Sequence, residues 1–306
     1  MASTHSSLTT VQNNANNKSN RTLNTERRLS MESSVFTLYN KAADELDTSQ
    51  RSAFQACHRE FLAEFIGTVI LVLLTCGFCA EQTLHIEESK SWLTSSFGSG
   101  LSVLIGICVS GHVSGAHLNP AVTIAFCIFS GFPIRKVPSY ITAQLLGAFA
   151  GAALLYIIIE PAIVQFDGGQ RYILGEKSTA GIFGTYPPLY VGIGSAIASE
   201  IMGTAMLLLV IMVTGHPNNL PYKSAQGAMI ALGITTISLC IGYTSGFSLN
   251  PARDFGPRLF TAIAGWGFDV FKVYHYYALV PMFAPILGGL VGLMLMMPFS
   301  FLSVRA

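Results

Sequence analysis

Six apolar segments, each about 20 residues long, constrain the fold of this chain more than any other feature. A segment of that length crosses the hydrocarbon core of a bilayer as a helix, because a helix satisfies its backbone polar groups internally. Charged residues make up only 11% of the sequence, whereas soluble domains carry about 25%. The predicted membrane spans are residues 61–80, 97–111, 139–159, 191–213, 224–242 and 274–297.

Two shorter apolar segments each begin with the triplet Asn-Pro-Ala. The triplets are Asn119-Pro120-Ala121 and Asn250-Pro251-Ala252, and they open residues 120–130 and 251–264. At about 1.5 Å per residue, each segment covers about half of a bilayer. Proline suits the first turn of a helix and asparagine suits the position before it. Each triplet is therefore predicted to start a half-length helix with Asn as its N-cap.

Three spans and one half-helix occur twice, over about residues 60–160 and 190–298, which indicates an internal repeat. Because three is an odd number, the second repeat must enter the membrane from the opposite side, and inverted repeats bring their half-helices together at the midplane. The predicted fold is an all-α membrane protein with six transmembrane helices and two re-entrant half-helices in two inverted repeats. Five glycines at helix-packing spacing are expected to pack the repeats against each other: Gly147, Gly151, Gly288, Gly289 and Gly292.

Residues 1–50 are predicted to be a disordered cytoplasmic tail without a cleaved leader, because they are rich in Ser, Thr and Asn and lack a compact apolar core. A membrane domain (51–298) and a short cytoplasmic C-terminus (299–306) follow. Basic residues in the short loops place both termini in the cytoplasm. Ser30 follows Arg27-Arg28 and fits a site for a basophilic kinase, or else this segment is only a solvated basic tail.

Two helix N-termini that meet inside a membrane form a positive site rich in donors, since each leaves four amides unpaired and carries roughly +0.5 of charge. A water or hydroxyl oxygen held beside Asn119 and Asn250 would interrupt a proton wire, and the field would repel cations. The sequence thus predicts a passive pore. The alternative is that each asparagine only caps a buried helix.

Five charged residues near the triplets or within the spans need a role. An arginine inside a membrane is a functional hypothesis by default, so Arg253 is predicted to face the pore. Asp254 is predicted to pair with Arg258, four residues on, because neighbouring residues on a helix point apart. Glu64 and Glu200 hold matching places in the two repeats. They are expected to accept bonds from the triplet loops, although a proton relay is the alternative.

Other site chemistry is less prominent. His117 is expected to brace the first loop, since no second ligand lies at metal spacing. Cys76-Gly77-Phe78-Cys79 is interpreted as small buried side chains, with a metal or redox pair as the alternative. A net charge of +1 does not suggest a nucleic-acid partner. No metal, cofactor or enzymatic activity is expected, because no nucleophile–base pair or phosphate loop is visible.

From about residue 61 to residue 298 the chain resembles the major intrinsic proteins, the aquaporins and aquaglyceroporins. The resemblance rests on residues 114–123 (SGAHLNPAVT) and 246–253 (GFSLNPAR), which are highly specific. It implies a homotetramer with one pore per subunit in residues 51–298. Asp254, Arg258, Pro281, Met282 and the segment Gly184-Thr185-Tyr186-Pro187 look like the glycerol-conducting branch, and the source is interpreted as fungal.

The resemblance also implies an outer selectivity filter. Phe247 and Arg253 match two of its positions, and ungapped counting from the triplets gives Ser238 and Ser99 for the others. The family usually has a bulky aromatic at the Ser99 position. Phe97 is the nearest aromatic, but two residues turn a helix by about 200°. Two serines would make this filter wide and polar.

The expected function is a passive channel for glycerol and other small neutral polar solutes together with water, which excludes protons and ions. The alternatives are a water-selective aquaporin or one permeable to urea or hydrogen peroxide. More distant alternatives are a proton-coupled solute transporter and a structural membrane protein. The expected partners are glycerol, water, the lipid bilayer, further copies of the chain in a homotetramer, and no nucleic acid. The expected location is the plasma membrane.

Overall fold

Helices make up most of the computed structural model, which describes residues 48–85 and 91–302. The chain divides into two units, residues 1–56 and 57–306. Of the first unit only residues 48–56 are described, and they are helical. Residues 1–47 of the predicted tail (1–50), with the predicted phosphorylation site Ser30, lie outside the described residues. The following paragraphs concern the second unit.

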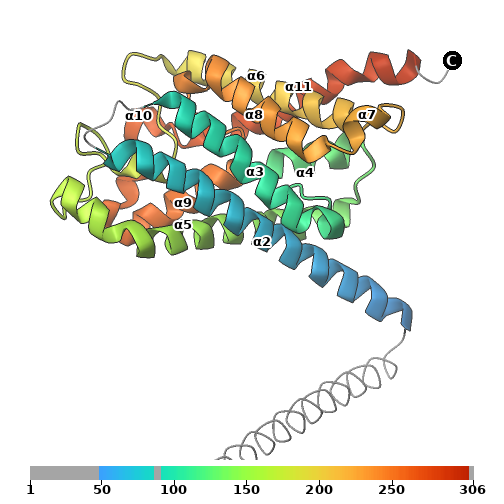
Figure 1. Cartoon of the computed structure of the whole chain (residues 1–306), viewed down its shortest axis with the longest axis horizontal. Helices are drawn as coiled ribbons and strands as arrows, with labels where there is room; N and C mark the ends of the chain where they lie inside the picture. The colour runs from blue at the N-terminus through green and yellow to red at the C-terminus, as the bar shows by residue number, and fades with distance from the viewer. Residues whose placement is uncertain (1–47, 86–90, 303–306) are drawn as a thin grey trace, which may run out of the picture. The chain divides into compact units, whose positions relative to one another are not determined.

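Six long helices and two short ones form the second unit (Figure 1). The long helices are α2 (Thr48–Leu84), α3 (Trp92–Ser114), α5 (Val137–Asp167), α6 (Ile193–Gly215), α8 (Gln226–Ile241) and α11 (Leu279–Leu302). The short helices α4 (Pro120–Phe129) and α9 (Pro251–Thr261) start at the triplets. The remaining turns of helix are η1 (Ile134–Lys136), η2 (Ala180–Ile182), α7 (Leu220–Lys223), η3 (Gly242–Thr244), η4 (Ala262–Trp266), η5 (Phe268–Phe271) and α10 (Val273–Tyr276).

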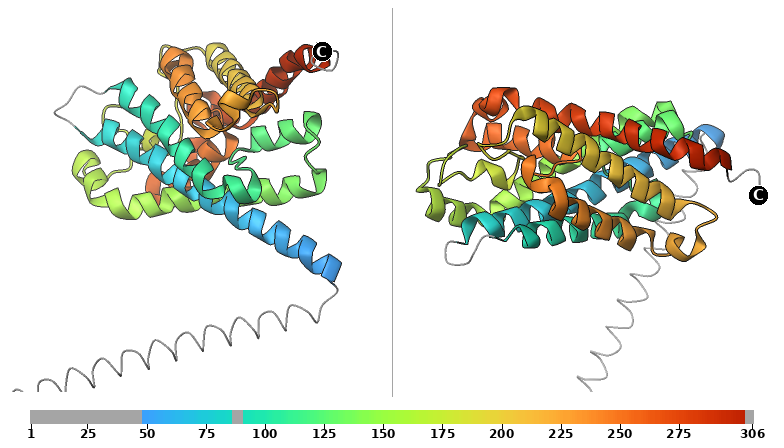
Figure 2. Two further views of the ribbon diagram at one scale, coloured as in Figure 1. Left: turned by 45° about the vertical axis from the view of Figure 1, so that its right-hand side comes forward. Right: turned by 90° about the horizontal axis from the view of Figure 1, so that it is seen from above.

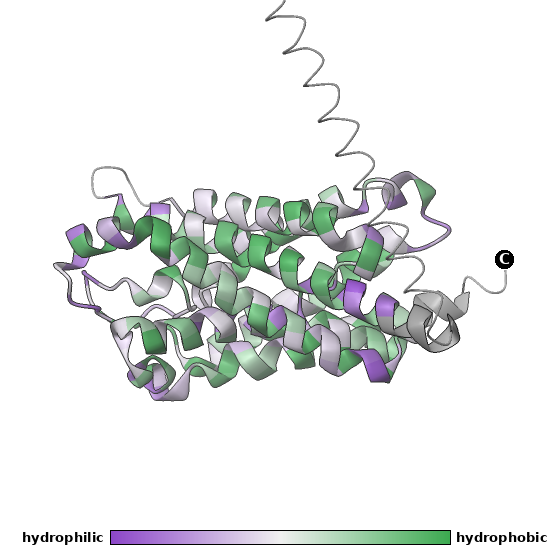
Figure 3. Ribbon diagram, turned by 90° about the horizontal axis from the view of Figure 1, so that it is seen from below, coloured by the Kyte–Doolittle hydropathy of each residue, from purple (hydrophilic) through white to green (hydrophobic). Residues whose placement is uncertain are grey.

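Six of these helical segments are long and apolar enough to cross a membrane. The prediction of an all-α fold with six spans and two half-length helices in inverted repeats is confirmed. The helices extend beyond the predicted spans. The first runs over Gln55–Leu84 and the third over Ile134–Asp167, because a helix continues through polar residues at its ends while a count of apolar residues stops there. In Figure 3 most of the hydrophilic colour lies toward the two ends of the bundle.

The two repeats contact each other in a symmetric pattern. Helix α5 of the first repeat packs against α9 of the second, and α11 of the second packs against α4 of the first. Helices α3 and α8, which hold equivalent places, pack against each other. The long connection between α5 and α6 lies at one end of the bundle and the turn around α7 lies at the other (Figure 2). This arrangement encloses α4 and α9 between long helices.

Four of the five predicted packing glycines lie against helices of their own repeat. A Cβ atom on Gly151 of α5 would come within 2.6 Å of the Val69 carbonyl oxygen of α2, and a Cβ on Gly288 of α11 would overlap the Ile201 carbonyl of α6. The prediction that these glycines join the two repeats is therefore wrong for Gly147, Gly151, Gly288 and Gly292. Sequence spacing indicates close helix approach but does not identify the partner helix.

Most of the glycines that lie between the repeats come from other positions. A Cβ on Gly100 of α3 would lie 2.5 Å from the Ala231 carbonyl oxygen of α8, and one on Gly256 of α9 would lie 2.6 Å from the Ala148 side chain of α5. Of the five predicted glycines only Gly289 meets the other repeat, against α4. Absent side chains thus allow the helix axes to approach both within and between the repeats.

Replacing Gly288 by alanine should lower the thermal stability of the protein. The new Cβ would overlap a backbone carbonyl that cannot turn aside, and overpacking of this kind costs about 1–3 kcal/mol. We expect a lower melting temperature for the purified protein in detergent. The matched control is Gly194→Ala in α6, where no atom lies within 4 Å of the added Cβ. Equal melting temperatures for the two variants would contradict the close α6–α11 packing.

Candidate functional site

Both asparagines cap the short helices that they precede. Asn119 Oδ1 accepts a hydrogen bond from the Ala121 amide at 2.8 Å. Asn250 Oδ1 accepts one from the Ala252 amide at 3.0 Å and one from the Arg253 amide at 3.3 Å. Each asparagine has extended backbone angles and is followed by proline. The predicted N-caps are confirmed.

The two asparagines also join the repeats through reciprocal hydrogen bonds. Asn119 Nδ2 donates to the Leu249 carbonyl oxygen at 2.8 Å, and Asn250 Nδ2 donates to the Leu118 carbonyl oxygen at 2.7 Å. A side-chain amide has two N–H donors. One donor of each asparagine is therefore used to hold the opposite loop, and the other remains for a molecule between the helix ends.

Glu64 of α2 holds the loop that leads into α4. Its Oε1 accepts hydrogen bonds from Ser114 Oγ at 2.6 Å and from the His117 amide at 2.9 Å, and its Oε2 accepts one from the Leu118 amide at 2.7 Å. The carboxylate is completely buried. The loop amides that no helix could satisfy thus have a charged acceptor.

Glu200 of α6 does the same for the loop that leads into α9. It accepts hydrogen bonds from Ser245 Oγ at 2.7 Å, from the Ser248 amide at 2.9 Å and from the Leu249 amide at 2.8 Å. It is also completely buried. These contacts support the structural role predicted for both glutamates, because they tie each carboxylate to the loop that carries a triplet.

The two loops are strained at equivalent places. Ala116 and Leu118 in the first loop have φ of 51°, and Phe247 and Leu249 in the second have φ of 60° and 49°. This left-handed region is unfavourable for residues with a side chain, at a cost of about 1–2 kcal/mol each. The bonds to the buried glutamates hold the loops in this conformation.

A further polar network braces the first loop, and sequence reasoning missed most of it. Gln144 Nε2 donates to Glu64 Oε2 at 2.8 Å and to Thr123 Oγ1 at 3.0 Å. Thr123 Oγ1 donates to the Asn119 carbonyl oxygen at 3.1 Å and lies 3.1 Å from His117 Nδ1. Because the threonine proton is used, Nδ1 of His117 must carry the hydrogen of that bond. A glutamine within an apolar span was the signal for this network.

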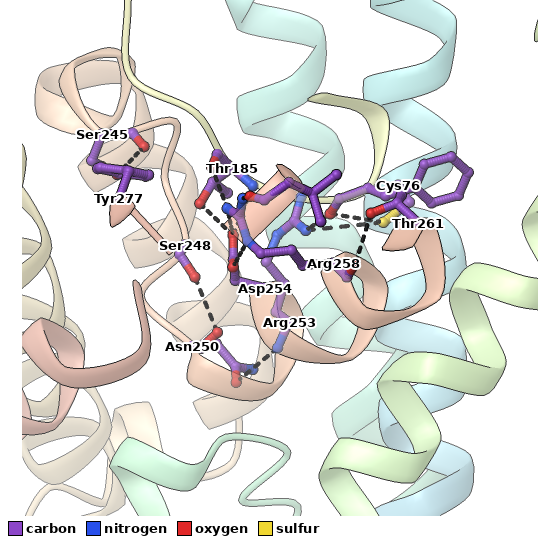
Figure 4. Close-up of polar contacts among 12 residues, drawn as sticks. Cys76, Thr185, Ser245, Ser248, Asn250, Arg253, Asp254, Arg258, Thr261 and Tyr277 are labelled. Atoms are coloured by element: carbon purple, nitrogen blue, oxygen red, sulfur yellow. Dashed lines mark hydrogen bonds and ion pairs between the residues drawn. The ribbon is translucent and has the colours of Figure 1, made fainter. Parts of the chain in front are cut away.

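Two tyrosines at equivalent places close the network in each repeat. Tyr140 of α5 donates to the Ser114 carbonyl oxygen at 2.9 Å, and Tyr277 donates to the Ser245 carbonyl oxygen at 2.5 Å. Figure 4 shows the second of these contacts. Both tyrosines are buried. Tyr140 lies early in the third span and Tyr277 lies early in the sixth, and these matching positions are the sequence signal for this role.

Arg253 is held by the connection between α5 and α6 (Figure 4). Its Nη1 donates to the Phe183 carbonyl oxygen at 2.8 Å, and Cys76 Sγ and Cys79 Sγ lie 3.9 and 3.7 Å from the guanidinium nitrogens. The arginine is 5% exposed and lines the central cavity. In the described part of the chain, no group of three metal-ligand side chains occurs.

Asp254 and Arg258 form the predicted i,i+4 ion pair, with Arg258 Nε 2.7 Å from Asp254 Oδ1. Asp254 Oδ2 also accepts from the Thr185 amide and hydroxyl, and Arg258 donates to the Thr185 carbonyl oxygen at 2.6 Å. The Arg258 guanidinium lies 4.5 Å from the centre of the Tyr186 ring. Burial raises the pKa of the Tyr186 phenol to about 12. The pair fixes the α5–α6 connection over α9.

A cavity of about 460 Å³ runs between the two loops. Among the predicted site residues, it is lined by Ser99, His117, Asn119, Phe247, Asn250 and Arg253. Apolar side chains from four long helices complete the wall, including Leu71, Val103, Leu207 and Ile230. The cavity therefore combines an apolar surface with polar groups from both loops.

Ser238, Pro281 and Met282 are not among the described residues that line the cavity. The Ser238 hydroxyl is buried and lies 2.8 Å from Ser96 Oγ of α3, so it faces the α3–α8 contact. Ungapped counting from the triplet predicts how far along α8 this residue lies, but it does not predict which way its side chain points. Pro281 and Met282 lie in the first turn of α11.

Exchanging Glu200 for glutamine should destabilise the protein, because an NH₂ group would then face one of the loop donors. A buried donor without an acceptor costs about 1–3 kcal/mol, so we expect a lower melting temperature in detergent. The matched control is Glu160→Gln, since Glu160 is 40% exposed and accepts one bond from Arg171 at 3.2 Å. If both variants melt like the original protein, the carboxylate does not hold the loop.

Comparisons of the sequence and of the structure with known proteins find relatives from one family. Residues 50–296 match the model of the family described as major intrinsic protein. The chain is 80% identical to "Aquaporin-2" of Rhizopus delemar over 86% of each chain, and 48% identical to "Aquaglyceroporin-2" of Rhizophagus irregularis over 76% of this chain and 74% of that one. The crystal structure of the aquaglyceroporin from Plasmodium falciparum aligns with a TM-score of 0.72 and 33% identity, over 80% of this chain and 99% of that one.

Six apolar helices make the chain a multi-pass membrane protein. The chain belongs to the major intrinsic protein family of passive membrane channels.

Proposed function

We propose that this channel conducts glycerol and other small neutral polar solutes together with water, and excludes protons and ions. The observation that carries the proposal is the mixed lining of the cavity. Asn119, Asn250 and Arg253 supply donors, and apolar side chains such as Val103 and Leu207 complete the wall. Glycerol combines hydroxyl groups with a carbon backbone, so both parts of the molecule find complementary surface.

The exclusion of cations follows from the charges around the cavity. The N-termini of α4 and α9 meet through the asparagine bonds, and each contributes a partial positive charge. Arg253 adds a fixed cation. A water oxygen that accepts bonds from both asparagines directs its hydrogens outward, and this orientation interrupts a proton wire.

The width of the proposed filter depends on Ser99, Phe247 and Arg253. Ser99 is small, and its hydroxyl donates to the Ser95 carbonyl oxygen at 2.7 Å, so it can still accept a bond from a solute. Phe247 supplies an apolar surface. Ser238 does not line the cavity, and its hydroxyl faces Ser96 of α3. Such a filter admits molecules larger than water, with urea and hydrogen peroxide as further candidates.

A proton-coupled transporter is less compatible with this site. That mechanism needs a carboxylate that exchanges protons with the solute pathway. Glu64 and Glu200 are completely buried, and their oxygens accept bonds from the loops. Neither glutamate is among the residues that line the cavity. A water-selective channel is the second candidate, because the relative from Rhizopus delemar is named an aquaporin.

The proposal includes the assembly and its location. We propose a homotetramer in the plasma membrane, as the family resemblance implies, with both termini in the cytoplasm. The basic residues on one side of the spans, including Arg59, Arg135 and Lys136, support this orientation.

Replacing Ser99 by tryptophan should separate the two candidate functions. The indole would fill the cavity at the proposed filter, so we expect glycerol permeability to fall on the order of tenfold while water permeability falls less, because pore diameter sets this selectivity. The measurement is stopped-flow light scattering of proteoliposomes under glycerol and sorbitol gradients.

The matched control is Phe97→Trp, two residues earlier in α3, where the side chain is 50% exposed. This variant should conduct like the original protein. Water flux without glycerol flux in the original protein would exclude the glycerol function and leave the water-selective candidate.

A further inference from the structure

Trp92 begins the same face of α3 that lines the cavity. Residues 92, 96, 99 and 103 are spaced three or four apart and lie on one face of the helix. Ser99 and Val103 line the cavity. Trp92 lies seven residues before Ser99, about 10 Å along the helix axis. The large aromatic side chain on this face thus stands two turns away from the small serine.

Trp92 anchors the end of α8. Its Nε1 donates to the Ser238 carbonyl oxygen at 2.9 Å. The same carbonyl accepts the amide of Gly242, the residue that ends α8. The hydroxyls of Ser96 and Ser238 lie 2.8 Å apart beside this contact. The C-terminal turn of α8 is therefore tied to α3 at one point.

The end of α8 forms the surface behind Phe247. A Cβ atom on Gly242 would lie 2.7 Å from Cδ2 of the Phe247 ring, so the ring packs directly on the glycine backbone. Trp92 packs against the apolar cluster that contains Phe247, Ile237 and Ile234. Phe247 has a left-handed backbone with φ of 60°, which is unfavourable for a residue with a side chain. The position of its ring therefore depends on the packing against Gly242.

We propose that Trp92 is a positioning residue that sets the solute size limit of the channel. It fixes the last turn of α8, this turn supports the Phe247 ring, and the ring forms one side of the filter opposite Arg253. Trp92 thereby limits the width of a filter that Ser99 leaves open. The inference rests on the proposed function, since it concerns the same filter.

The test compares the permeability of proteoliposomes to glycerol and to the five-carbon polyol xylitol. Trp92→Ala should raise the xylitol-to-glycerol ratio by about three- to tenfold, because the Phe247 ring loses its support and pore width sets which solutes pass. Trp92→Phe keeps an aromatic side chain and loses the N–H donor, so it should give a smaller increase in the xylitol-to-glycerol ratio. Gly242→Ala, which displaces Phe247 directly, should also change the ratio.

Trp266→Phe is the matched control. It replaces the only other tryptophan of the chain, whose Nε1 donates to Thr179 Oγ1 at 3.2 Å in the α5–α6 connection. The xylitol-to-glycerol ratio of this variant should equal that of the original protein. An unchanged ratio in folded Trp92→Phe and Gly242→Ala would overturn the proposal, as would an equal loss of both fluxes.

A spectroscopic readout separates this proposal from the proposed function. In the Trp266→Phe background Trp92 is the sole fluorophore of its kind, and Phe247→Ala should shift its emission maximum. Absence of a shift would contradict the packing of Trp92 against the cluster that contains Phe247. If the original protein conducts no glycerol, the proposed function fails, while the emission shift still shows whether Trp92 and Phe247 are coupled.

Discussion

Two buried carboxylates are the constraint on which the rest of the structure depends. Irregular backbone inside a membrane needs partners for its amides, because no water is present to supply them. Glu64 and Glu200 provide these partners, each for two amides and one hydroxyl. The loops can then adopt left-handed angles and deliver α4 and α9 to a common centre. Without these acceptors, the asparagine caps would have no fixed position from which to reach the opposite loop.

The repeats agree in what builds the pore and differ in what surrounds it. The glutamates, tyrosines and asparagines recur at equivalent places with equivalent bonds. The first repeat adds a neutral network around Gln144 and Thr123, whereas the second adds the buried Asp254–Arg258 pair. This pair also holds the long α5–α6 connection, through Thr185. The charged asymmetric feature therefore lies next to Arg253, whereas the neutral one lies beside Glu64.

Much of the fold was predictable from the sequence, because span length, charge content and the two triplets are local properties. The caps at Asn119 and Asn250 and the Asp254–Arg258 pair were predictable for the same reason. The partners of Gly151 and Gly288 were not, since spacing along one helix does not identify the helix beside it. Ser238 shows a related limit. Counting residues from the triplet predicts its position along α8 but not the direction of its side chain. The bond from Trp92 to α8 joins segments far apart in sequence and had no local signal.

In the proposed filter, the polarity and the width depend on different groups. Its polar groups are fixed by backbone bonds: Arg253 is tied to the Phe183 carbonyl oxygen, and Asn119 and Asn250 are tied to the opposite loops. Its width depends on side-chain volume at Ser99 and on the placement of Phe247. A change of volume at these positions breaks none of the bonds to the glutamates. The range of solutes can therefore change at little cost to the stability of the fold, whereas a change at a glutamate or an asparagine removes hydrogen bonds that hold the loops.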